Sequence, residues 1–394
     1  MSSEAADWGN SGLAYLTGPP DGPPDFSRAH VLTRAEGVAA DIAHRAGIRV
    51  AAAPLLTGRA ALLGLTRGGA VSCGGATRLL AARDGWCAIT LSRPDDVAAV
   101  PALVHADDVP ADPWPTLRRW AATQPVAAII ERAVLLDLPA AALGEVAATS
   151  PRIERMGFRA EAHRIAGLLV ADLSSMWAGP LCGQLLARAG ATVVKVESPR
   201  RPDGTRSGNR AFFDWMNGGK LSYCVDFDNA GELRDLLAVA DVVIEGSRPA
   251  ALARRRLGPG DVAPRAGRIW LQITGYDEHS PRPAFGDDAA VAGGLVGTGH
   301  GEPVFCGDAI ADPLTGLEAA CAVTESLVRG GGESIHVSLA AVAATYAALP
   351  TQPSASGHPA PPPTVPAAAA PAAELGDHNE AVRRLVAERR CLSC

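Results

Sequence analysis

From Ile165 onwards the sequence alternates short apolar runs with stretches of helical spacing. The apolar runs cover residues 167–173, 192–197, 240–245 and 268–273, the helical stretches include 180–189 and 314–328, and a further strand is expected at 334–339. Apolar runs of this length, separated by helices, are typical of parallel strands that helices cover on both faces. The pattern predicts an α/β fold, with a Rossmann-like parallel sheet flanked by helices over residues 160–349.

The part of the chain before residue 160 has a different pattern. Two β-prone runs, 77–80 and 86–91, flank Ala82-Arg83-Asp84-Gly85 and predict a hairpin. We expect a helix at 34–46, and then a smaller α+β domain over residues 61–155 with helices at 94–103, 114–123 and 126–150, the last broken at Leu138-Pro139. Residues 350–373 are mostly Pro and Ala, which predicts a linker, and 374–394 should form a C-terminal helix and tail.

Composition excludes several classes of function. The net charge of −6 and the absence of a long basic run argue against nucleic acid as a partner. No apolar run approaches the roughly 20 residues that cross a bilayer, so we expect no membrane partner. Eight scattered Cys predict reduced thiols, a cytoplasmic protein and no metal site. Cys391 and Cys394 have the CxxC spacing of redox and metal sites, but without a second ligand pair we interpret them as part of a frayed terminus.

Small residues follow the first apolar run of the α/β part, in the sequence Ser174-Ser175-Met176-Trp177-Ala178-Gly179. Such residues let a ligand approach the backbone, and the N-terminus of the next helix offers unpaired N–H groups to an anion. The fingerprint GxGxxG is missing, which disfavours a dinucleotide. From the residues alone, either an anion cradle at Ala178 and Gly179 or an ordinary tight turn fits.

The sequence from this turn onwards resembles a known family. AGPLCGQLLARAGATVVKVESP, residues 178–199, is similar to the opening signature of family III (CaiB/BaiF-type) CoA-transferases, to which formyl-CoA transferases and α-methylacyl-CoA racemases belong. The resemblance continues in order through Ala240–Glu245, Arg248-Pro249 and Ile273–Tyr276 to Ala311–Gly316, so it covers roughly residues 165–345. It implies a coenzyme A (CoA) binding domain, and no cofactor beyond that substrate.

The resemblance also implies a set of functional residues. Asp312, four positions before Gly316, matches the aspartate that attacks the acyl thioester in the family. Its alternative role is to cap the helix that begins at Pro313. For binding CoA, the resemblance and the need for cations near phosphates suggest Ala178, Gly179, Arg206, Lys220, Ala251 and Arg254.

Gly286-Asp287-Asp288 stands where racemases of the family carry a His-Asp pair. A carboxylate in place of the imidazole can act as a base if its pKa is raised, so Asp287 and Asp288 are possible auxiliary groups. The loss of His disfavours racemisation. The alternative is an exposed acidic turn without function.

The segments follow one another in an unusual order. Gly74-Gly75 resembles the glycine-rich loop of the family's small domain, which in the family follows the catalytic Asp. Residues 1–60 resemble a degenerate repeat of the active-site segment and connector, with a short strand expected at 48–52 and His30 opposite Asp312. We therefore expect a permuted chain that forms a homodimer, as the family does, with the family's interlock in doubt.

Three functions remain open at this point. The first is CoA transfer between an acyl-CoA and a carboxylic acid through an aspartyl-CoA intermediate. The second is racemisation of an α-methylacyl-CoA. The third is a non-catalytic acyl-CoA-binding partner subunit.

Overall fold

The large domain is built on a seven-stranded sheet. The computed structural model describes residues 3–161, 164–248, 251–355 and 357–391. The strand order is β4-β12-β9-β8-β5-β6-β7, parallel except for the edge strand β4. In chain order the strands are β4 Arg152–Arg155, β5 Leu169–Leu173, β6 Thr192–Glu197, β7 Leu221–Cys224, β8 Val242–Glu245, β9 Ile269–Thr274 and β12 Glu333–Ser338. This arrangement confirms the predicted α/β class.

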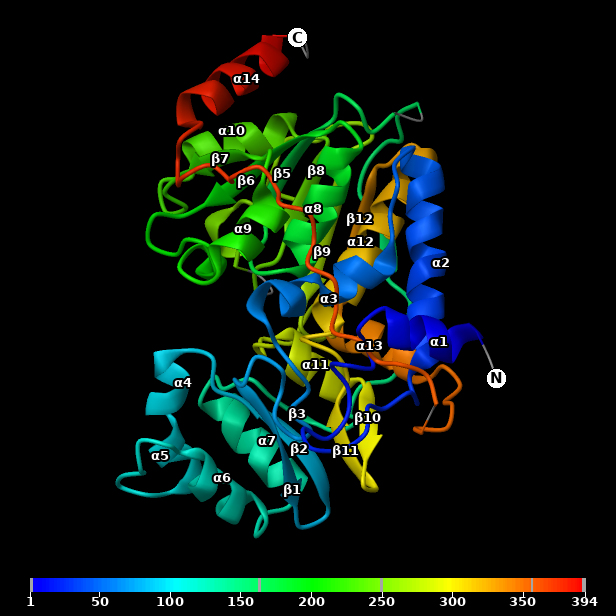
Figure 1. Ribbon diagram of the computed structural model, residues 1–394. Helices are drawn as coiled ribbons and strands as arrows, with labels where there is room; N and C mark the ends of the chain where they lie inside the picture. Colours follow the sequence, from blue (N-terminus) through cyan, green and yellow to red (C-terminus); the bar gives the residue numbers. More distant parts are fainter. Residues whose placement is uncertain (1–2, 162–163, 249–250, 356, 392–394) are drawn as a thin grey trace.

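Helices cover both faces of this sheet, as Figure 1 shows. Successive residues of β5 point to opposite faces, so Val170 packs with α8 and α12 while Leu169 packs with α10 and α14. Both faces are therefore apolar, which is why the strands read as continuous apolar runs. The helices and 3₁₀ turns of this domain are α8 Ala178–Arg188, η1 Gly204–Arg206, α9 Arg210–Asn217, α10 Gly231–Val239, η2 Ala253–Arg255, α11 Gly286–Ala292, α12 Ala311–Val328, α13 Leu339–Ala347 and α14 Asn379–Cys391.

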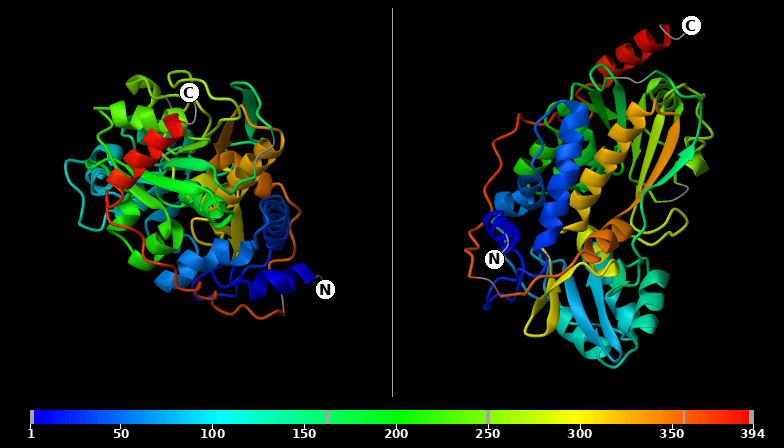
Figure 2. Two further views of the ribbon diagram at one scale, coloured as in Figure 1. Left: turned by 90° about the horizontal axis from the view of Figure 1, so that it is seen from above. Right: turned by 90° about the vertical axis from the view of Figure 1, so that its right-hand side faces the viewer.

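The N-terminal segment packs onto the large domain. It contains α1 Ser3–Asn10, α2 Ala29–Ala46 and α3 Ala52–Leu63, and α2 lies alongside α12 (Figure 2). Arg28, just before α2, donates to the carbonyl groups of Gly294, Val296 and Ala347 at 3.3, 2.7 and 3.0 Å. The expected strand at 48–52 is wrong, because this stretch leads directly into α3.

The small domain has its own sheet and core. Its strands are β1 Thr77–Ala82, β2 Gly85–Thr90 and β3 Ala140–Ala142, and its helices are α4 Pro94–Ala98, α5 Val100–Val104, α6 Trp114–Ala121 and α7 Val126–Leu135. The predicted hairpin is confirmed, with Ala82 opposite Gly85. Two expectations are wrong. The helix expected over 126–150 ends at Leu135 and gives way to β3, and 152–155, expected in the small domain, form β4 of the large sheet.

A short hairpin and the Pro/Ala-rich tail complete the chain. The hairpin pairs β10 Val296–Gly299 with β11 Glu302–Phe305. The described part of 350–373 has no helix or strand, as predicted, yet it is attached to the body, since the carbonyl of Ala372 accepts from Arg210 at 2.6 Å. His378 and Asn379 then close the free edge of β7 by bonding Ser222 and Cys224.

Two further predictions concern the ends of the chain and the membrane. Cys391 is exposed at the end of α14, and Cys394 lies outside the described residues. Among the described residues no helix is long and apolar enough to cross a membrane.

Candidate functional site

The turn between β5 and α8 is compact, as the close packing at Gly179 and the backbone conformation of Met176 show. A Cβ atom at position 179 would lie 2.2 Å from the Ser174 side chain, so only glycine fits there. Met176 has a φ of 72°, in the left-handed region that non-glycine residues rarely adopt. Trp177 then precedes the first residue of α8, and its side chain is almost fully buried. The turn is thus a strained, tightly defined corner at the carboxyl end of β5.

Buried ion pairs hold the backbone of this turn in place. Lys195 Nζ donates to the Ser174 carbonyl at 2.5 Å and pairs with Asp203 at 2.6 Å, and Asp203 in turn accepts from the Met176 amide. Asp172 bonds the Ser174 amide and pairs with Lys220 at 2.8 Å. We call these four residues, Lys195, Asp203, Asp172 and Lys220, with the adjoining pair Glu197 and Arg206, the turn network.

Charges within the turn network compensate one another. Burial acts to raise the pKa of Asp172, but Lys220, Lys195 and the hydrogen bonds outweigh it, so the pKa is lowered. Lys195 and its hydrogen bond likewise outweigh the effect of burial on Asp203 and lower its pKa. These carboxyl groups stay ionised, and they orient the backbone of the turn.

Two of the cations proposed for CoA are committed to this network. Lys220 is buried and donates to Asp172, to the Pro180 carbonyl and to Asn217. Arg206 forms a two-point contact with Glu197, at 2.8 and 2.6 Å. Both charges point into the protein, where they support the turn that leads into Ala178 and Gly179 at the start of α8.

The other proposed CoA-binding residues lie beyond β8. Arg254 is exposed in η2, and Ala251 is half-buried beside it. Pro249, a part of the motif that suggested them, lies outside the described residues. An exposed guanidinium at this position is free to meet a phosphate, so the role of Arg254 stays a prediction.

Asp312 lies in the first turn of α12, close to the start of α8. Residue 310 is the N-cap and carries no side-chain cap, so the capping role considered for Asp312 is wrong. A Cβ at Gly316, one turn further along, would lie 2.8 Å from the Ala178 carbonyl. This glycine therefore lets α12 and α8 approach closely, and Asp312 lies one helical turn before this contact.

Gly286 contacts the Asp312 carboxylate directly. Its backbone N–H bonds the carboxylate, and a Cβ at this position would lie 2.5 Å from Asp312 Oδ2. Ala309 adopts a φ of 43°, and its amide donates to Asp287 Oδ1 at 3.0 Å. Asp287 also accepts from Ser72. Two backbone segments thus converge on a pair of carboxylates from α11 and α12.

A third carboxylate and one guanidinium complete this group. Asp308 is fully buried and accepts from Arg59 Nη1 at 2.6 Å, while its Oδ2 has no partner among the described residues. We call Asp287, Asp308, Asp312 and Arg59 the acidic cluster.

Carboxyl groups of the acidic cluster hold protons more tightly than usual. Burial, together with the charge of Asp287, raises the pKa of Asp312 to about 7, although Arg59 and the Gly286 N–H oppose the rise. Burial and the charge of Asp308 raise the pKa of Asp287 to about 6. These groups exchange protons near neutral pH, as a catalytic acid, base or nucleophile often does.

Arg59 and Asp308 were not predicted as site residues from the sequence. Position 58 is glycine, and a Cβ there would lie 2.5 Å from the Trp215 ring and 2.7 Å from Pro366, so α3 packs closely enough to place Arg59 in the cluster. Its guanidinium lies 5.9 Å from the ring centroids of both Trp177 and Phe212. A signal existed, since Arg59 is the one charged residue within α3.

The loop that leads into β1 contributes neighbours to the cluster. A Cβ at Gly74 would lie 3.5 Å from Arg59 Nη2, and Gly75 has a φ of 79°; both are exposed. Burial raises the pKa of the Cys73 thiol well above its usual range, so this thiol is neutral and not a nucleophile. The predicted glycine-rich loop thus lies beside the acidic cluster.

Asp288 belongs to a different environment. It is fully buried and bonds the Phe285 amide and Thr90 Oγ1, both at 3.0 Å, so the alternative of an exposed acidic turn is wrong for this residue. Its bond to Thr90 joins α11 to β2. Asp288 therefore links the two domains, and Asp287 alone of the pair belongs to the acidic cluster.

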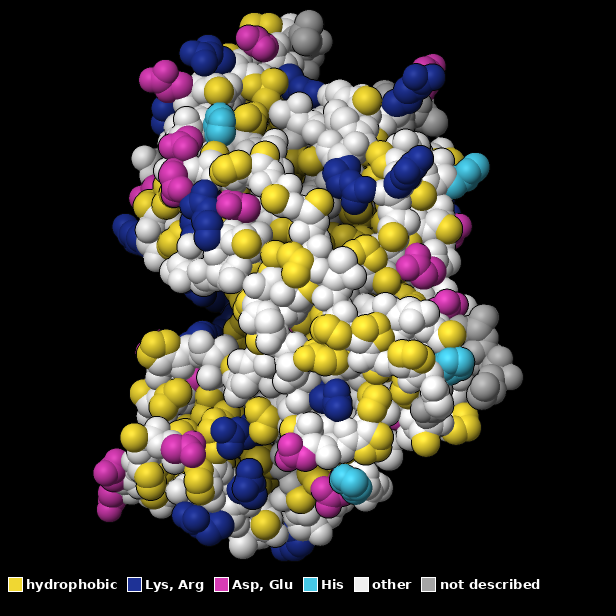
Figure 3. All heavy atoms as spheres, viewed as in Figure 1, with side chains coloured by type: hydrophobic (Ala, Val, Ile, Leu, Met, Phe, Trp, Pro, Cys, Tyr) yellow, Lys and Arg dark blue, Asp and Glu magenta, His cyan; other side chains and the backbone are white. Residues whose placement is uncertain are grey.

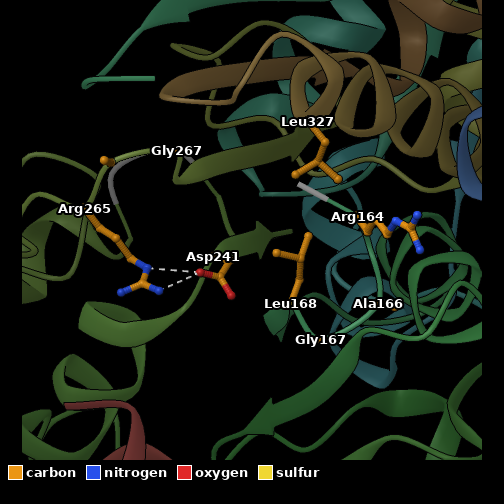
Figure 4. Close-up of a pocket in the computed structure, with 9 residues that line it drawn as sticks. Arg164, Ala166, Gly167, Leu168, Asp241, Arg265, Gly267 and Leu327 are labelled. Carbon is orange, nitrogen blue, oxygen red and sulfur yellow. Dashed lines mark hydrogen bonds and ion pairs between the residues drawn. The ribbon is translucent and has the colours of Figure 1, made fainter. Parts of the chain in front are cut away.

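Two hollows are visible on the surface. Figure 3 shows the face hollowed between the part that bears α9 and the part that bears α4, with Lys and Arg side chains inside. A separate pocket, drawn in Figure 4, is lined by Leu168, Asp241 and Arg265, which pairs with Asp241 at 2.8 Å. This pocket lies at the amino ends of β5, β8 and β9, the edge opposite the turn, whereas ligands of such sheets bind at the carboxyl ends.

Comparisons with known proteins match the same part of the chain. The sequence profile described as CoA-transferase family III matches residues 165–373. A succinate–glutarate CoA-transferase of Agrobacterium fabrum is 30% identical over 48% of this chain and 53% of its own length. A succinyl-CoA:glutarate CoA-transferase of Mus musculus is 32% identical over 42% of each chain.

A CaiB/BaiF family protein from Brucella suis is 30% identical over 48% of this chain and 56% of that one, with a TM-score of 0.43. The chain spans about half the length of the curated relatives that it matches.

Proposed function

The chain belongs to CoA-transferase family III, and we propose that it moves CoA from an acyl-CoA thioester to a free carboxylic acid, with Asp312 as the nucleophile. One observation carries the proposal. The Asp312 carboxylate lies against the Gly286 backbone, one helical turn before Gly316, which packs on the Ala178 carbonyl at the start of α8.

The reaction divides into exchanges that this geometry supports. A carboxylate oxygen of Asp312 attacks the thioester carbonyl and expels the CoA thiolate, which leaves a mixed anhydride. The thiolate attacks the Asp312 carbonyl of that anhydride, releases the first acid and forms an aspartyl-CoA thioester. The acceptor carboxylate then repeats these two exchanges in reverse, and Asp312 regains its free carboxylate. No net proton transfer is needed.

Further support comes from the turn at Ala178 and Gly179. The turn network fixes it, and the N-terminus of α8 faces the same edge of the sheet, where an anion such as a diphosphate is stabilised. The proposed contacts of CoA with Ala178, Gly179, Ala251 and Arg254 lie along this edge, after β5 and β8. We propose that Arg206 and Lys220 act on CoA through the turn rather than by direct contact.

The printed names of the relatives guide the choice of substrate. They include succinyl-CoA as donor and glutarate as acceptor, so the first assay should follow exchange between these two. Asp312→Asn should lower the exchange rate by at least about a thousandfold and leave CoA binding within about twofold. Mass spectrometry of the wild-type protein with succinyl-CoA should detect a CoA adduct on Asp312. Normal exchange by the Asn variant would refute the nucleophile.

A specific observation favours a second candidate, racemisation of an α-methylacyl-CoA. Asp287 shares the cluster with Asp312 and has a pKa of about 6, raised by burial, as a proton-abstracting base requires. Incorporation of solvent deuterium at the α position without any acceptor acid would establish this activity. Exchange of CoA without deuterium uptake would exclude it.

We further propose that the chain forms a homodimer, as the family resemblance implies. Light scattering of the purified protein measures the mass directly. Full activity in a monomer would overturn this proposal.

A further inference from the structure

Arg59 is the cation that acts on all three carboxylates of the acidic cluster. It pairs directly with Asp308, and its charge lowers the pKa values of Asp287 and Asp312 against the effect of burial. It comes from α3 in the N-terminal segment, whereas the carboxylates come from the large domain. One positive charge therefore faces up to three negative ones.

The guanidinium has donors that the protein does not use. Asp308 accepts from Nη1, and neither Nε nor Nη2 has an acceptor among the described residues. The side chain is 25% exposed, and the neighbouring position 74 is glycine, where a Cβ would lie 3.5 Å from Nη2. An open side of Arg59 is thus available to a ligand.

A second donor without a partner lies in the same place. Trp177 Nε1 is buried and has no acceptor among the described residues, and the Trp177 ring centroid lies 5.9 Å from the Arg59 guanidinium. Buried polar groups without partners are rare in folded proteins. Two unused sets of donors beside Asp312 suit a ligand with several acceptor oxygens, such as a carboxylate.

The proposed reaction brings such a ligand to this position. The acceptor acid is an anion that must approach the carbonyl carbon of Asp312, in a cluster already rich in negative charge. When Asp312 carries CoA as a thioester it has no charge, so one of the three competing carboxylates is neutralised. The charge balance of the cluster then favours an incoming carboxylate.

We propose that Arg59 binds the carboxylate of the acceptor acid, and that it does so when Asp312 is in the aspartyl-CoA form. This inference rests on the proposed function. Asp308 is then a positioning residue, because it holds Nη1 and leaves Nε and Nη2 directed to the ligand. The acceptor acid would then bind after the first acid has been released. The free enzyme repels a carboxylate that the aspartyl-CoA form of the enzyme accepts.

Binding of acetate tests the subsite without turnover. Asp312→Asn imitates the neutral aspartyl group, and at pH 8 it should bind acetate about tenfold more tightly than the wild type, as measured by NMR titration. Adding Arg59→Gln should remove this gain, whereas adding Arg59→Lys should keep part of it. Acetamide should bind none of the variants detectably. Equal affinity of the single and the Gln-containing double variant for acetate would overturn the proposal.

Kinetics test it in the active enzyme. Arg59→Gln should raise the KM of the acceptor acid at least tenfold and leave the KM of the acyl-CoA within about twofold, while Asp308→Asn should raise only the acceptor KM, by a smaller factor. Arg200→Gln, on the exposed surface, is the matched control. Thermal unfolding checks that each variant is folded, and Arg59→Lys supplies a folded variant if Gln does not.

The two proposals fail in different ways. If the wild type exchanges CoA but Arg59→Gln leaves the acceptor KM unchanged, the Arg59 assignment is wrong and the transferase assignment stands. If no exchange occurs with any acid, yet acetate binds the Asn variant through Arg59, the subsite stands and the transferase proposal fails.

Discussion

Two buried groups of charges flank the start of α8, and they are built on opposite principles. In the turn network three carboxylates face three cations, namely Asp172, Glu197 and Asp203 with Lys195, Lys220 and Arg206. In the acidic cluster three carboxylates face Arg59. The pKa values follow this difference, because they fall for Asp172 and Asp203 and rise for Asp287, Asp308 and Asp312.

This difference indicates a structural role for the turn network and a chemical role for the acidic cluster. Buried charges that are fully paired stay ionised and fix the surrounding backbone, whereas carboxylates without enough cations are held in an unfavourable environment and gain or lose protons easily. Proteins accept that cost at functional sites, and the rest of the fold must offset it. The turn network should therefore govern stability, and the acidic cluster should govern reactivity.

The largest expected effect comes from breaking the balance of the turn network. Lys220→Met removes the direct ion-pair partner of the buried Asp172 carboxylate, which should cost about 3–5 kcal/mol of unfolding free energy. Denaturant unfolding followed by circular dichroism measures this loss. The double variant Asp172→Asn with Lys220→Met should recover part of the stability, since it buries no unpaired charge. A single Met variant as stable as the wild type would show that the network does not support the fold.

The second-largest effect is expected from a substitution in the backbone beside the acidic cluster. In Gly286→Ala the added methyl group would lie 2.3 Å from the Ala309 carbonyl and 2.5 Å from Asp312 Oδ2, so the carboxylate must move. We expect a stability loss of about 1–3 kcal/mol and a fall in CoA exchange of about a hundredfold.

Gly37→Ala is the matched control for this change. Gly37 lies in α2 with open space around it, so the methyl group should stabilise the protein by up to about 1 kcal/mol and leave exchange unchanged. If Gly286→Ala kept full activity, the contact with Asp312 would not position the nucleophile.

A smaller effect separates the two groups by their response to pH. Burial raises the pKa of Asp312 from 3.8 to about 7, so the folded protein binds this proton more tightly than the unfolded chain. The group therefore costs stability as pH rises from about 4 to about 7, and the cost is constant above that. The unfolding free energy of Asp312→Asn should equal that of the wild type near pH 4. At pH 8 it should be higher by about 1–2 kcal/mol, after allowance for the partial exposure of the carboxyl group.

Thermal unfolding between pH 4 and pH 8 measures that difference. Asp172→Asn should behave in the opposite way, because its lowered pKa stabilises the fold above the ordinary carboxyl range and this gain disappears in acid. The exchange rate of the wild type should rise with pH through about 7, as Asp312 ionises. If Asp312→Asn destabilised the protein at pH 8, that result would contradict the account of an unbalanced cluster.

The fold was predictable where burial leaves a pattern in the sequence. Strands β5, β6, β8 and β9 contribute to the apolar cores on both faces of the sheet, and they appear in the sequence as mainly apolar runs. Edge strand β4 left no such pattern, because all four of its residues are exposed and three are charged. The tail 350–373 has the composition of a linker, and only tertiary hydrogen bonds such as that of Arg210 with the Ala372 carbonyl attach it to the body.

The site was predictable only in part. Asp312 belongs to a local motif, so the resemblance could point to it. Lys220 and Arg206 were assigned to CoA as cations within the segment that resembles the family, and sequence cannot tell an inward cation from an exposed one. Arg59 is more than 200 residues from Asp308 in the chain, and it meets that carboxylate only because Gly58 lets α3 pack closely. Contacts of this kind depend on the three-dimensional packing of distant segments.

The smallest expected effect sets the scale for the others. Arg200 and Asp228 form an ion pair with exposed side chains near the turn network, at 3.0 Å. Because water screens both charges, Arg200→Gln should change the unfolding free energy by about 0.5 kcal/mol or less, and salt should reduce even this. Denaturant unfolding at low and high ionic strength measures the change. A loss as large as that from Lys220→Met would mean that burial does not distinguish the turn network from the surface, and the contrast between the two buried groups would then have to rest on charge balance alone.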